Sequence, residues 1–145
     1  MILHNIITYG AQIGYTGSEK RVISENLMSA DEDPATITSQ LRKDLECGRV
    51  SSHSGRHPFY SSPLGLVAKS NGSWRRIHHL SHPHGDSVND WIPESCSTLE
   101  YTTIEHVFHL VRKAGKGAII VKKDLKDAFR MIPVAPHDRW LLGFS

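Results

Sequence analysis

The sequence has few cysteines and no long apolar run, and each absence excludes a class of protein. Its only cysteines, Cys47 and Cys96, lie far apart and have no close-spaced partners. This spacing argues against a disulfide framework and against a zinc knuckle, so both are expected to be plain thiols. The longest unbroken apolar run is AIIV at residues 118–121, whereas a helix that spans a bilayer needs about 20 residues. We therefore expect no membrane span and no membrane partner.

The N-terminus lacks the features of a secretory signal. Its first residues, MILHNIITYGAQIGYTG, contain no basic region, no sustained apolar stretch and no obvious cleavage site. We therefore expect an intracellular protein, and the sequence does not distinguish the nucleus from the cytoplasm.

A strong charge of one sign is absent as well. The 145 residues carry 17 lysines and arginines and 15 acidic residues, a net charge of +2. Residues 1–60 hold 6 basic and 7 acidic residues, a balance of −1, and residues 61–145 hold 11 and 8, a balance of +3. This surplus is only a slight indication of a polyanionic partner. Length and composition fit one ordinary domain or a piece of one, and exclude a large multidomain enzyme.

One helix is predicted over about residues 34–47. Residues 1–30, before it, mix glycines and polar residues without a clear period and are expected to form either an irregular extension or short elements packed on a neighbour. Asp33 fits an N-cap, Pro34 fits the first helical position, and Gly48 is expected to end the helix. The apolar positions repeat at helical spacing, at Ile37, Leu41 and Leu45.

A β-hairpin is predicted around the dipeptide Asn71-Gly72, because this pair tolerates the positive φ angles of a two-residue type I′ turn. Its arms are expected at about 64–70 and 73–80, with a loop over SHPHGDSVNDWIPE after them. The two-residue turn implies the cross-strand pairs Ser70 with Ser73, Lys69 with Trp74, and Ala68 with Arg75.

A second helix is predicted from Thr102 to Gly115, because Thr102 and Glu105 have the spacing of a capping box and apolar residues recur at helical intervals. A central strand, AIIVKKD, is expected to follow and to run into Asp124. A short helical turn and a further strand, WLLGF, are expected to close the chain. The order of these elements predicts an α+β fold.

Asp124 is a candidate metal ligand. A carboxylate at the end of an apolar strand is exposed at a sheet edge, and Mg²⁺ prefers charged oxygen ligands that neutralise phosphate charge during phosphoryl transfer. The alternative is that Asp124 simply caps the short helix beginning at Leu125, and residue type alone favours this alternative.

Cations of the hairpin are candidate phosphate ligands. Lys69, Arg75 and Arg76 could grip a triphosphate or a nucleic-acid backbone, although a solvated charged face is the simpler account when they are taken alone. The histidines of the following segment argue against a zinc site, because His78 and His79 point to opposite strand faces and no cysteine lies near. Exposed imidazoles are the expectation there.

Two ordered motifs resemble reverse transcriptases of retroelements. SPLGLVAKSNGSWRRIHHLSHPHGDSVND is similar to their fingers hairpin, in which an apolar strand, a lysine, a Gly-containing turn and Trp-Arg recur in this order. VKKDLKDAFRMIPV is similar to their first catalytic motif, a strand-ending Asp followed five residues later by an aromatic residue. ITSQLRKDLECGRV resembles the helix before the fingers, and GAQIGYTG, IHHLSHP, SVNDWIP and LLGF resemble the DIRS-group variant, which uses a tyrosine recombinase.

The resemblance implies a role for individual residues. Asp124 would coordinate two Mg²⁺ ions, with the backbone carbonyl of Leu125 as a further ligand. Phe129 would face the ribose and exclude a 2′-hydroxyl. Arg75, and with it Lys69, would hold the incoming triphosphate. The expected strand pairing puts Lys69 and Arg75 on opposite faces, so both reach one phosphate only if the hairpin twists or carries a bulge.

The resemblance also implies an incomplete right-hand polymerase, made of the fingers hairpin and the first half of the palm. Residues 1–30 would be an N-terminal extension, 31–93 the first fingers segment, 94–132 the first half of the palm, and 133–145 a truncated return to the fingers. The family's later Asp-Asp motif does not occur between Asp124 and Ser145, and His79-Leu80-Ser81 stands where many members have Asp-aromatic-Arg.

Three functional hypotheses follow. The first is a fragment of an RNA-directed DNA polymerase whose partners are an RNA or DNA template-primer, a dNTP and the remainder of the polymerase chain. Because two of the three metal carboxylates are missing, we expect no primer extension by this chain alone. The second is a non-catalytic nucleic-acid-binding remnant or domesticated module that uses Lys69, Arg75, Arg76, Lys122 and Lys123. The third is a decayed fragment with no function, in which the open edge of the sheet could prevent the fragment from folding alone.

Overall fold

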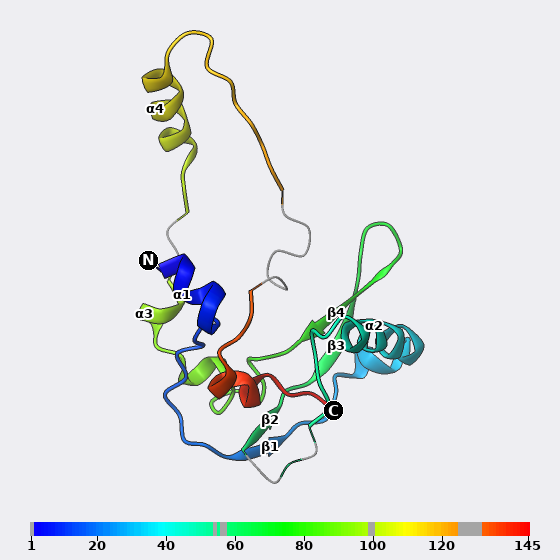
Figure 1. The fold of residues 1–145 in the computed structure, drawn as a ribbon. Coiled ribbons are helices and arrows are strands. Elements are labelled where there is room, and N and C mark those ends of the chain that lie inside the picture. The colour runs from blue at the N-terminus through cyan, green and yellow to red at the C-terminus, as the bar shows by residue number, and fades with distance from the viewer. Residues whose placement is uncertain (1, 54, 56–57, 99–100, 125–131) are drawn as a thin grey trace.

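The computed structural model describes residues 2–53, 55, 58–98, 101–124 and 132–145. They form a small α+β domain with a projecting arm, which comprises residues 101–124 (Figure 1). These described residues form two sheets of two strands each, β1–β2 and β3–β4. The expectation of an α+β fold is therefore confirmed, although these elements alone do not identify a polymerase fold.

The first predicted helix is present as α2, which spans Pro34–Glu46. Asp33 is its N-cap and accepts a hydrogen bond from the amide of Thr36 at 2.9 Å, and Pro34 occupies the first turn. Gly48 follows the helix with a φ of +66°. The face of α2 that points inward differs from the predicted apolar stripe. Leu45, which belongs to that stripe, is 54% exposed, whereas Asp44 is buried.

Of the two alternatives that the sequence left open for the segment before α2, the structure shows the short packed elements. The segment contains the helix α1 (Ile2–Tyr9), the strand β1 (Arg21–Ile23) and the 3₁₀ helix η1 (Met28–Asp31). After α1, Gly10 has a φ of +89° and packs so closely on Ala135 that an added Cβ would lie 2.5 Å from the Ala135 nitrogen. This contact is possible only for glycine, and it joins the two ends of the chain.

The main core lies where β1 pairs in parallel with β2 (Phe59–Ser61). Tyr60 of β2, Val88 and Leu141 are fully buried and pack together. Around them lie partly buried apolar side chains: Ile13, Tyr15, Val22, Leu80, Ile92 and Trp140. The Tyr60 hydroxyl donates to the backbone carbonyl of Asp86, so the segment that the sequence assigned to a loop is held against the core. That segment contains the 3₁₀ helix η2 (Asn89–Trp91) and is followed by the short helix α3 (Glu94–Ser97).

The predicted hairpin is present, with β3 (Leu64–Ala68) antiparallel to β4 (Trp74–His78). Its register was predicted wrongly by one residue, because Ala68 pairs with Trp74 rather than with Arg75. The turn contains three residues instead of two, since the Lys69 amide donates to the Ser73 carbonyl at 2.8 Å and the Gly72 amide to the Lys69 carbonyl at 3.0 Å. Gly72 has a φ of +78°, as expected for a type I turn followed by a bulge.

The second predicted helix is present as α4, which spans Ile104–Ala114. Its N-cap is Thr103 rather than Thr102, and His106 rather than Glu105 completes the capping box. The predicted central strand after Gly117 is absent, because the described residues 118–124 are extended but pair with no other strand. Ile119 is 89% and Val121 82% exposed. An apolar sequence alone therefore did not produce a strand, since it lacks a pairing partner.

The final predicted strand is also absent. Residues Pro136–Leu142 form the 3₁₀ helix η4, which buries Leu141. Extended backbone resumes at Gly143, which forms a parallel bridge with Ser61 at the end of β2. The chain end therefore packs beside β2 instead of adding a strand of its own.

Candidate phosphate-binding hairpin

The three-residue turn places Lys69 and Arg75 on one face of the hairpin. Val67 pairs with Arg75, and Lys69 lies two residues beyond Val67 on the same strand, so all three side chains share a face. The sequence-based register put the two cations on opposite faces unless the hairpin twisted or carried a bulge. The bulged turn meets this condition.

The two cations also line the same hollow. A surface cavity of about 410 Å³ lies at the hairpin tip, lined by Val67, Ala68, Lys69, Ser70, Asn71 and Arg75. Lys69 and Arg75 are both exposed, so their positive groups are available to a solvent-borne anion. The turn is held by Asn71, whose Oδ1 accepts hydrogen bonds from the Ser73 hydroxyl at 2.7 Å and the Ser73 amide at 3.2 Å. These side-chain hydrogen bonds order the loop without using either cation.

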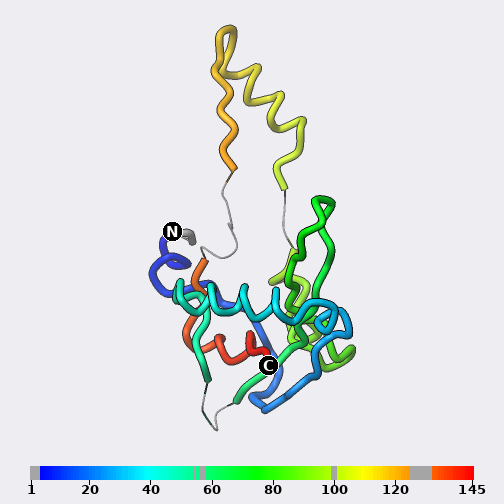
Figure 2. Tube along the Cα trace, turned by 90° about the vertical axis from the view of Figure 1, so that its right-hand side faces the viewer, coloured from blue at the N-terminus to red at the C-terminus, as the bar shows by residue number. Residues whose placement is uncertain are grey.

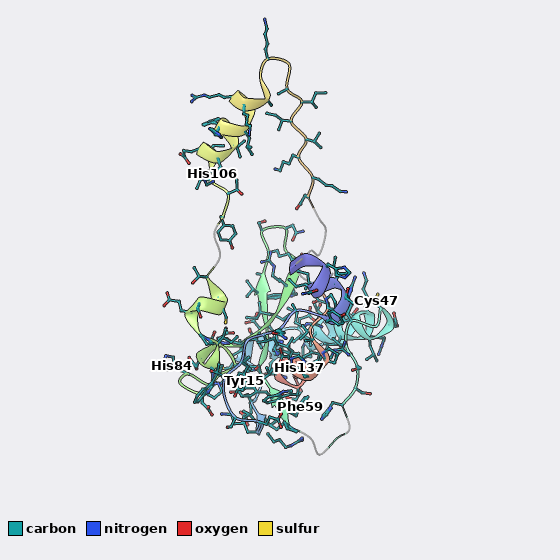
Figure 3. All side chains as sticks on the ribbon, turned by 60° about the vertical axis from the view of Figure 1, so that its left-hand side comes forward. Tyr15, Cys47, Phe59, His84, His106 and His137 are labelled. Carbon is teal, nitrogen blue, oxygen red and sulfur yellow. The ribbon has the colours of Figure 1, made fainter. Side chains whose placement is uncertain are left out.

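The hairpin and the projecting arm stand on the same side of the body (Figures 1 and 2). The arm carries exposed cations, including Lys122 and Lys123, that sequence reasoning had named as phosphate contacts. It also carries exposed Arg112, Lys113 and Lys116, which sequence reasoning had not selected. Figure 3 shows the side chains of the arm, with His106 labelled, spreading from the ribbon away from those of the body.

Arg76 does not share the environment of Arg75. Its side chain is only 10% exposed, and its Nη2 lies 2.6 Å from Oδ2 of Asp44 on α2. The idea that Arg76 contributes to an exposed phosphate-gripping surface is therefore wrong. Strand alternation explains the difference, because neighbouring residues of β4 point to opposite faces.

Asp124 lies exposed at the end of the projecting arm, in extended backbone without a strand. The expected position at the edge of a sheet is therefore wrong. Leu125 and Phe129, the other residues expected near the nucleotide, lie outside the described residues.

The residues that the structure describes do not by themselves make a magnesium site. A two-metal centre needs several oxygen ligands around the ions. In the described part of the chain, no three His, Cys, Asp or Glu side chains are grouped so as to hold a metal ion. Asp124 thus offers one carboxylate, which is fewer ligands than a two-metal centre requires.

The histidines at the end of β4 and in the segment after it have different environments. His78 and His79 are partly buried, and His82 and His84 are exposed. The expectation of exposed imidazoles is wrong for His78, whose Nε2 lies 3.0 Å from the Gly143 carbonyl oxygen. Burial lowers the pKa of His78; the hydrogen bond to that carbonyl raises it by a smaller amount, and the charge of Arg76 lowers it further.

A second polar cluster lies beside the core, away from the hairpin tip. Lys20 forms an ion pair with Asp86, and the Trp91 indole donates to the same carboxylate at 3.1 Å. The hydrogen bonds from Lys20 and Trp91 lower the pKa of Asp86. Burial, followed by the nearby Asp86 charge, raises the pKa of Tyr60 to about 12. These groups bind one another and fix the 81–93 segment, so they have a structural role.

Sequence reasoning missed Asp44 and Phe144. Asp44 lies seven residues after Ile37 and three after Leu41, which is the same helical face as the apolar stripe. This spacing is the signal that could have identified an inward carboxylate. Phe144, whose ring centroid lies 5.9 Å from the Arg76 guanidinium carbon, had no comparable local signal.

Comparison of the chain with protein family models, curated proteins and solved structures found no match. No helix in the described ranges is both long and apolar enough to cross a membrane.

Proposed function

We propose that this chain is the fingers and early palm portion of a retrotransposon RNA-directed DNA polymerase, with a hairpin that holds the triphosphate of an incoming deoxynucleotide. The whole protein would join this nucleotide to the 3′-hydroxyl of a primer on an RNA or DNA template. Asp124 would contribute one carboxylate to magnesium there. Residues outside the described ranges, Leu125 and Phe129, keep the roles that the sequence resemblance implies.

The single observation that supports the proposal is the placement of Lys69 and Arg75. Both are exposed, lie on one face and line one hollow of about 410 Å³. A triphosphate has several anionic oxygens, and a guanidinium can bind two of them while an ammonium acts as a second point charge. The fold around the hairpin is consistent with this use, because β3 and β4 are anchored at their base and leave the tip free to meet a ligand.

The anchoring comes from the segment before α2. The Leu64 amide donates to Oδ1 of Asn26 at 2.8 Å, and the Leu66 amide donates to the Ser29 hydroxyl at 3.1 Å. Leu64 and Leu66 are both buried. The lower half of the hairpin is therefore part of the body of the domain, and the cationic tip projects from a rigid base.

Titration calorimetry with inorganic tripolyphosphate tests the proposal directly. We expect Lys69→Ala and Arg75→Ala each to weaken binding by about tenfold or more, since a hydrogen bond to a charged group contributes about 1.5–3 kcal/mol. Arg42→Ala is the matched control, because Arg42 is an exposed cation on α2. Equal loss in the control, or no binding by the wild-type chain, would contradict the proposal.

A second candidate function is non-catalytic binding of nucleic acid. The exposed cations of the projecting arm favour it, because this region places Arg112, Lys113, Lys116, Lys122 and Lys123 in solvent. Its distinguishing result is salt-sensitive binding of a mixed-sequence DNA duplex that persists in Asp124→Asn and weakens in Lys122→Ala. Triphosphate binding that depends on Lys69 and Arg75 would favour the first candidate instead.

A further inference from the structure

Arg76 occupies a buried junction between three parts of the molecule. Its guanidinium binds Asp44 of α2 at 2.6 Å and lies 5.9 Å from the ring centroid of Phe144 near the chain end. Asp44 is 3% exposed, and its other oxygen accepts a bond from Arg49 at 3.2 Å. Arg76 itself belongs to β4, so this junction joins the hairpin, the helix and the chain end.

Stability alone is a weak explanation for this junction. Removing two charges from water is costly, and an apolar pair of similar volume often stabilises a fold as well or better. The Arg76 guanidinium is also incompletely satisfied, because its Nη1 is buried and has no hydrogen-bond partner in the described residues. An arginine–carboxylate pair does, however, restrict the relative orientation of the two side chains, because a planar guanidinium bonds a carboxylate in few geometries.

A restraint on the orientation of Arg76 also affects the residues on the opposite face of β4. Arg76 pairs with Leu66 across the hairpin, and Arg75 pairs with Val67. Since adjacent side chains of a strand point to opposite faces, a restraint on Arg76 restricts rotation of β4 about its own axis. The same restraint would therefore act, together with the pairing to β3, on the direction of Arg75 and through the short turn on the position of Lys69.

We propose that the Asp44–Arg76 pair is a positioning device that aims the Lys69 and Arg75 side chains at a common anion. This inference rests on the proposed triphosphate-binding function of the hairpin. Asp44 and Arg76 do not touch the ligand in this account. They act through the orientation of β4, against which α2 packs (Figure 1).

One substitution is expected to change the affinity for the anion in opposite directions under the positioning account and under simple electrostatics. Asp44→Asn removes a negative charge, so charge alone would strengthen binding of a polyanion. Loss of the restraint on Arg76 would weaken it. Glu46→Gln is the matched control, because Glu46 is an exposed acid on the same helix and its neutralisation changes the net charge equally.

We expect Asp44→Asn to weaken tripolyphosphate binding by about tenfold, as small misplacements of binding groups commonly do. Glu46→Gln is expected to leave binding unchanged or slightly tighter. Arg76→Lys provides a second variant that keeps the buried charge but loses the fork geometry. It is expected to weaken binding without changing the dependence on salt concentration, because a residue that does not contact phosphate leaves the number of phosphate contacts unchanged.

Hydrogen exchange at the hairpin tip provides a readout that does not need the ligand. The amides of Lys69 and Gly72 are bonded within the turn, and we expect both to exchange faster in Asp44→Asn and Arg76→Lys than in Glu46→Gln. Circular dichroism selects the variants that remain folded. If either folded variant binds as tightly as the wild type and exchanges at the wild-type rate, the positioning role is overturned.

The two proposals fail in different ways. A wild-type chain that binds no tripolyphosphate overturns the proposed function, and faster exchange in Asp44→Asn would then still support the restraint on β4. A wild-type chain that binds, with Asp44→Asn binding more tightly, overturns the positioning role and leaves the proposed function standing.

Discussion

His78 and Gly143 lie in contact, with Nε2 of the imidazole 3.0 Å from the Gly143 carbonyl oxygen. The same imidazole packs edge-on against the ring of Phe144, with centroids 5.7 Å apart. Gly143 also accepts a bond from the Ser62 amide at 2.9 Å. A residue of the hairpin thus helps to hold the chain end beside β2, and the burial of its imidazole, which lowers its pKa, is expected to make the stability of the domain depend on pH.

Acidification is expected to destabilise the domain through His78. Its pKa in the folded chain is below the ordinary value of 6.5, so between these two values the unfolded chain binds more protons. The folding stability associated with neutral His78 is fully present above about pH 6.5. It is lost as the pH falls through the pKa of His78 in the folded state. Urea unfolding at pH 7 and pH 5 measures the effect. His78→Gln should reduce the difference between the two pH values, and His109→Gln, on exposed α4, should not.

Removal of the α2 cap is expected to lower the melting temperature by a few degrees. Asp33 accepts hydrogen bonds from the Thr36 amide and from the Thr36 hydroxyl, at 2.9 Å and 2.7 Å, and these bonds lower its pKa. Asp33→Ala leaves the Thr36 amide without its cap. Asp33→Asn should keep most of the stability, because asparagine is an equally good N-cap. Thermal melts that do not distinguish the two variants would contradict the assignment of the cap.

The hairpin turn is expected to be sensitive at Gly72 for reasons of backbone conformation alone. Its φ is +78° and an added Cβ would meet nothing within 4 Å, so Gly72→Ala introduces strain without a clash. We expect a loss of about 1 kcal/mol in unfolding free energy, together with weaker tripolyphosphate binding as Lys69 shifts. Gly72→Asn should be milder, since asparagine tolerates this conformation. Equal urea midpoints for both variants and the wild type would argue against the bulged turn.

Truncation is expected to lower the unfolding free energy strongly at Leu141 and hardly at all at Leu110. Leu141 is 0% exposed and packs on Tyr60 and Val88, so Leu141→Ala should cost about 2–5 kcal/mol. Leu110 of α4 is 60% exposed, and Leu110→Ala should change the unfolding free energy by less than about 0.5 kcal/mol. Chemical denaturation measures both. A large loss at Leu110 would mean that the arm packs on the body in solution.

Local signals in the sequence predicted those elements whose causes are local. The Asp33-Pro34 start and Gly48 end of α2 are set by capping and backbone preference within a few residues. The Asn71-Gly72 hairpin was found for the same reason. Its register was missed because Asn-Gly also fits a three-residue bulged turn, and a change of one loop residue moved Lys69 to the face of Arg75.

Features that depend on distant partners could not be predicted in this way. Residues 118–124 have the composition of a central strand, but strand formation needs a neighbour and the described residues supply none. WLLGF was expected to be a strand because it is apolar, yet Leu141 is buried by a 3₁₀ helix. Asp44 lies on the apolar face of α2, but the partner that allows a carboxylate to be buried there, Arg76, is 32 residues later in the chain.

A proteolytic cut in the backbone of the projecting arm is expected to leave the body of the domain assembled. The arm carries several exposed basic residues, which are sites for trypsin, whereas residues 132–145, later in the chain, are joined to the body of the domain by other contacts. Ala11 bonds to Pro133 through its amide at 2.7 Å, and Leu141 is enclosed by the core. A cut in the arm would therefore yield two peptides that remain one particle under native conditions and separate only in denaturant.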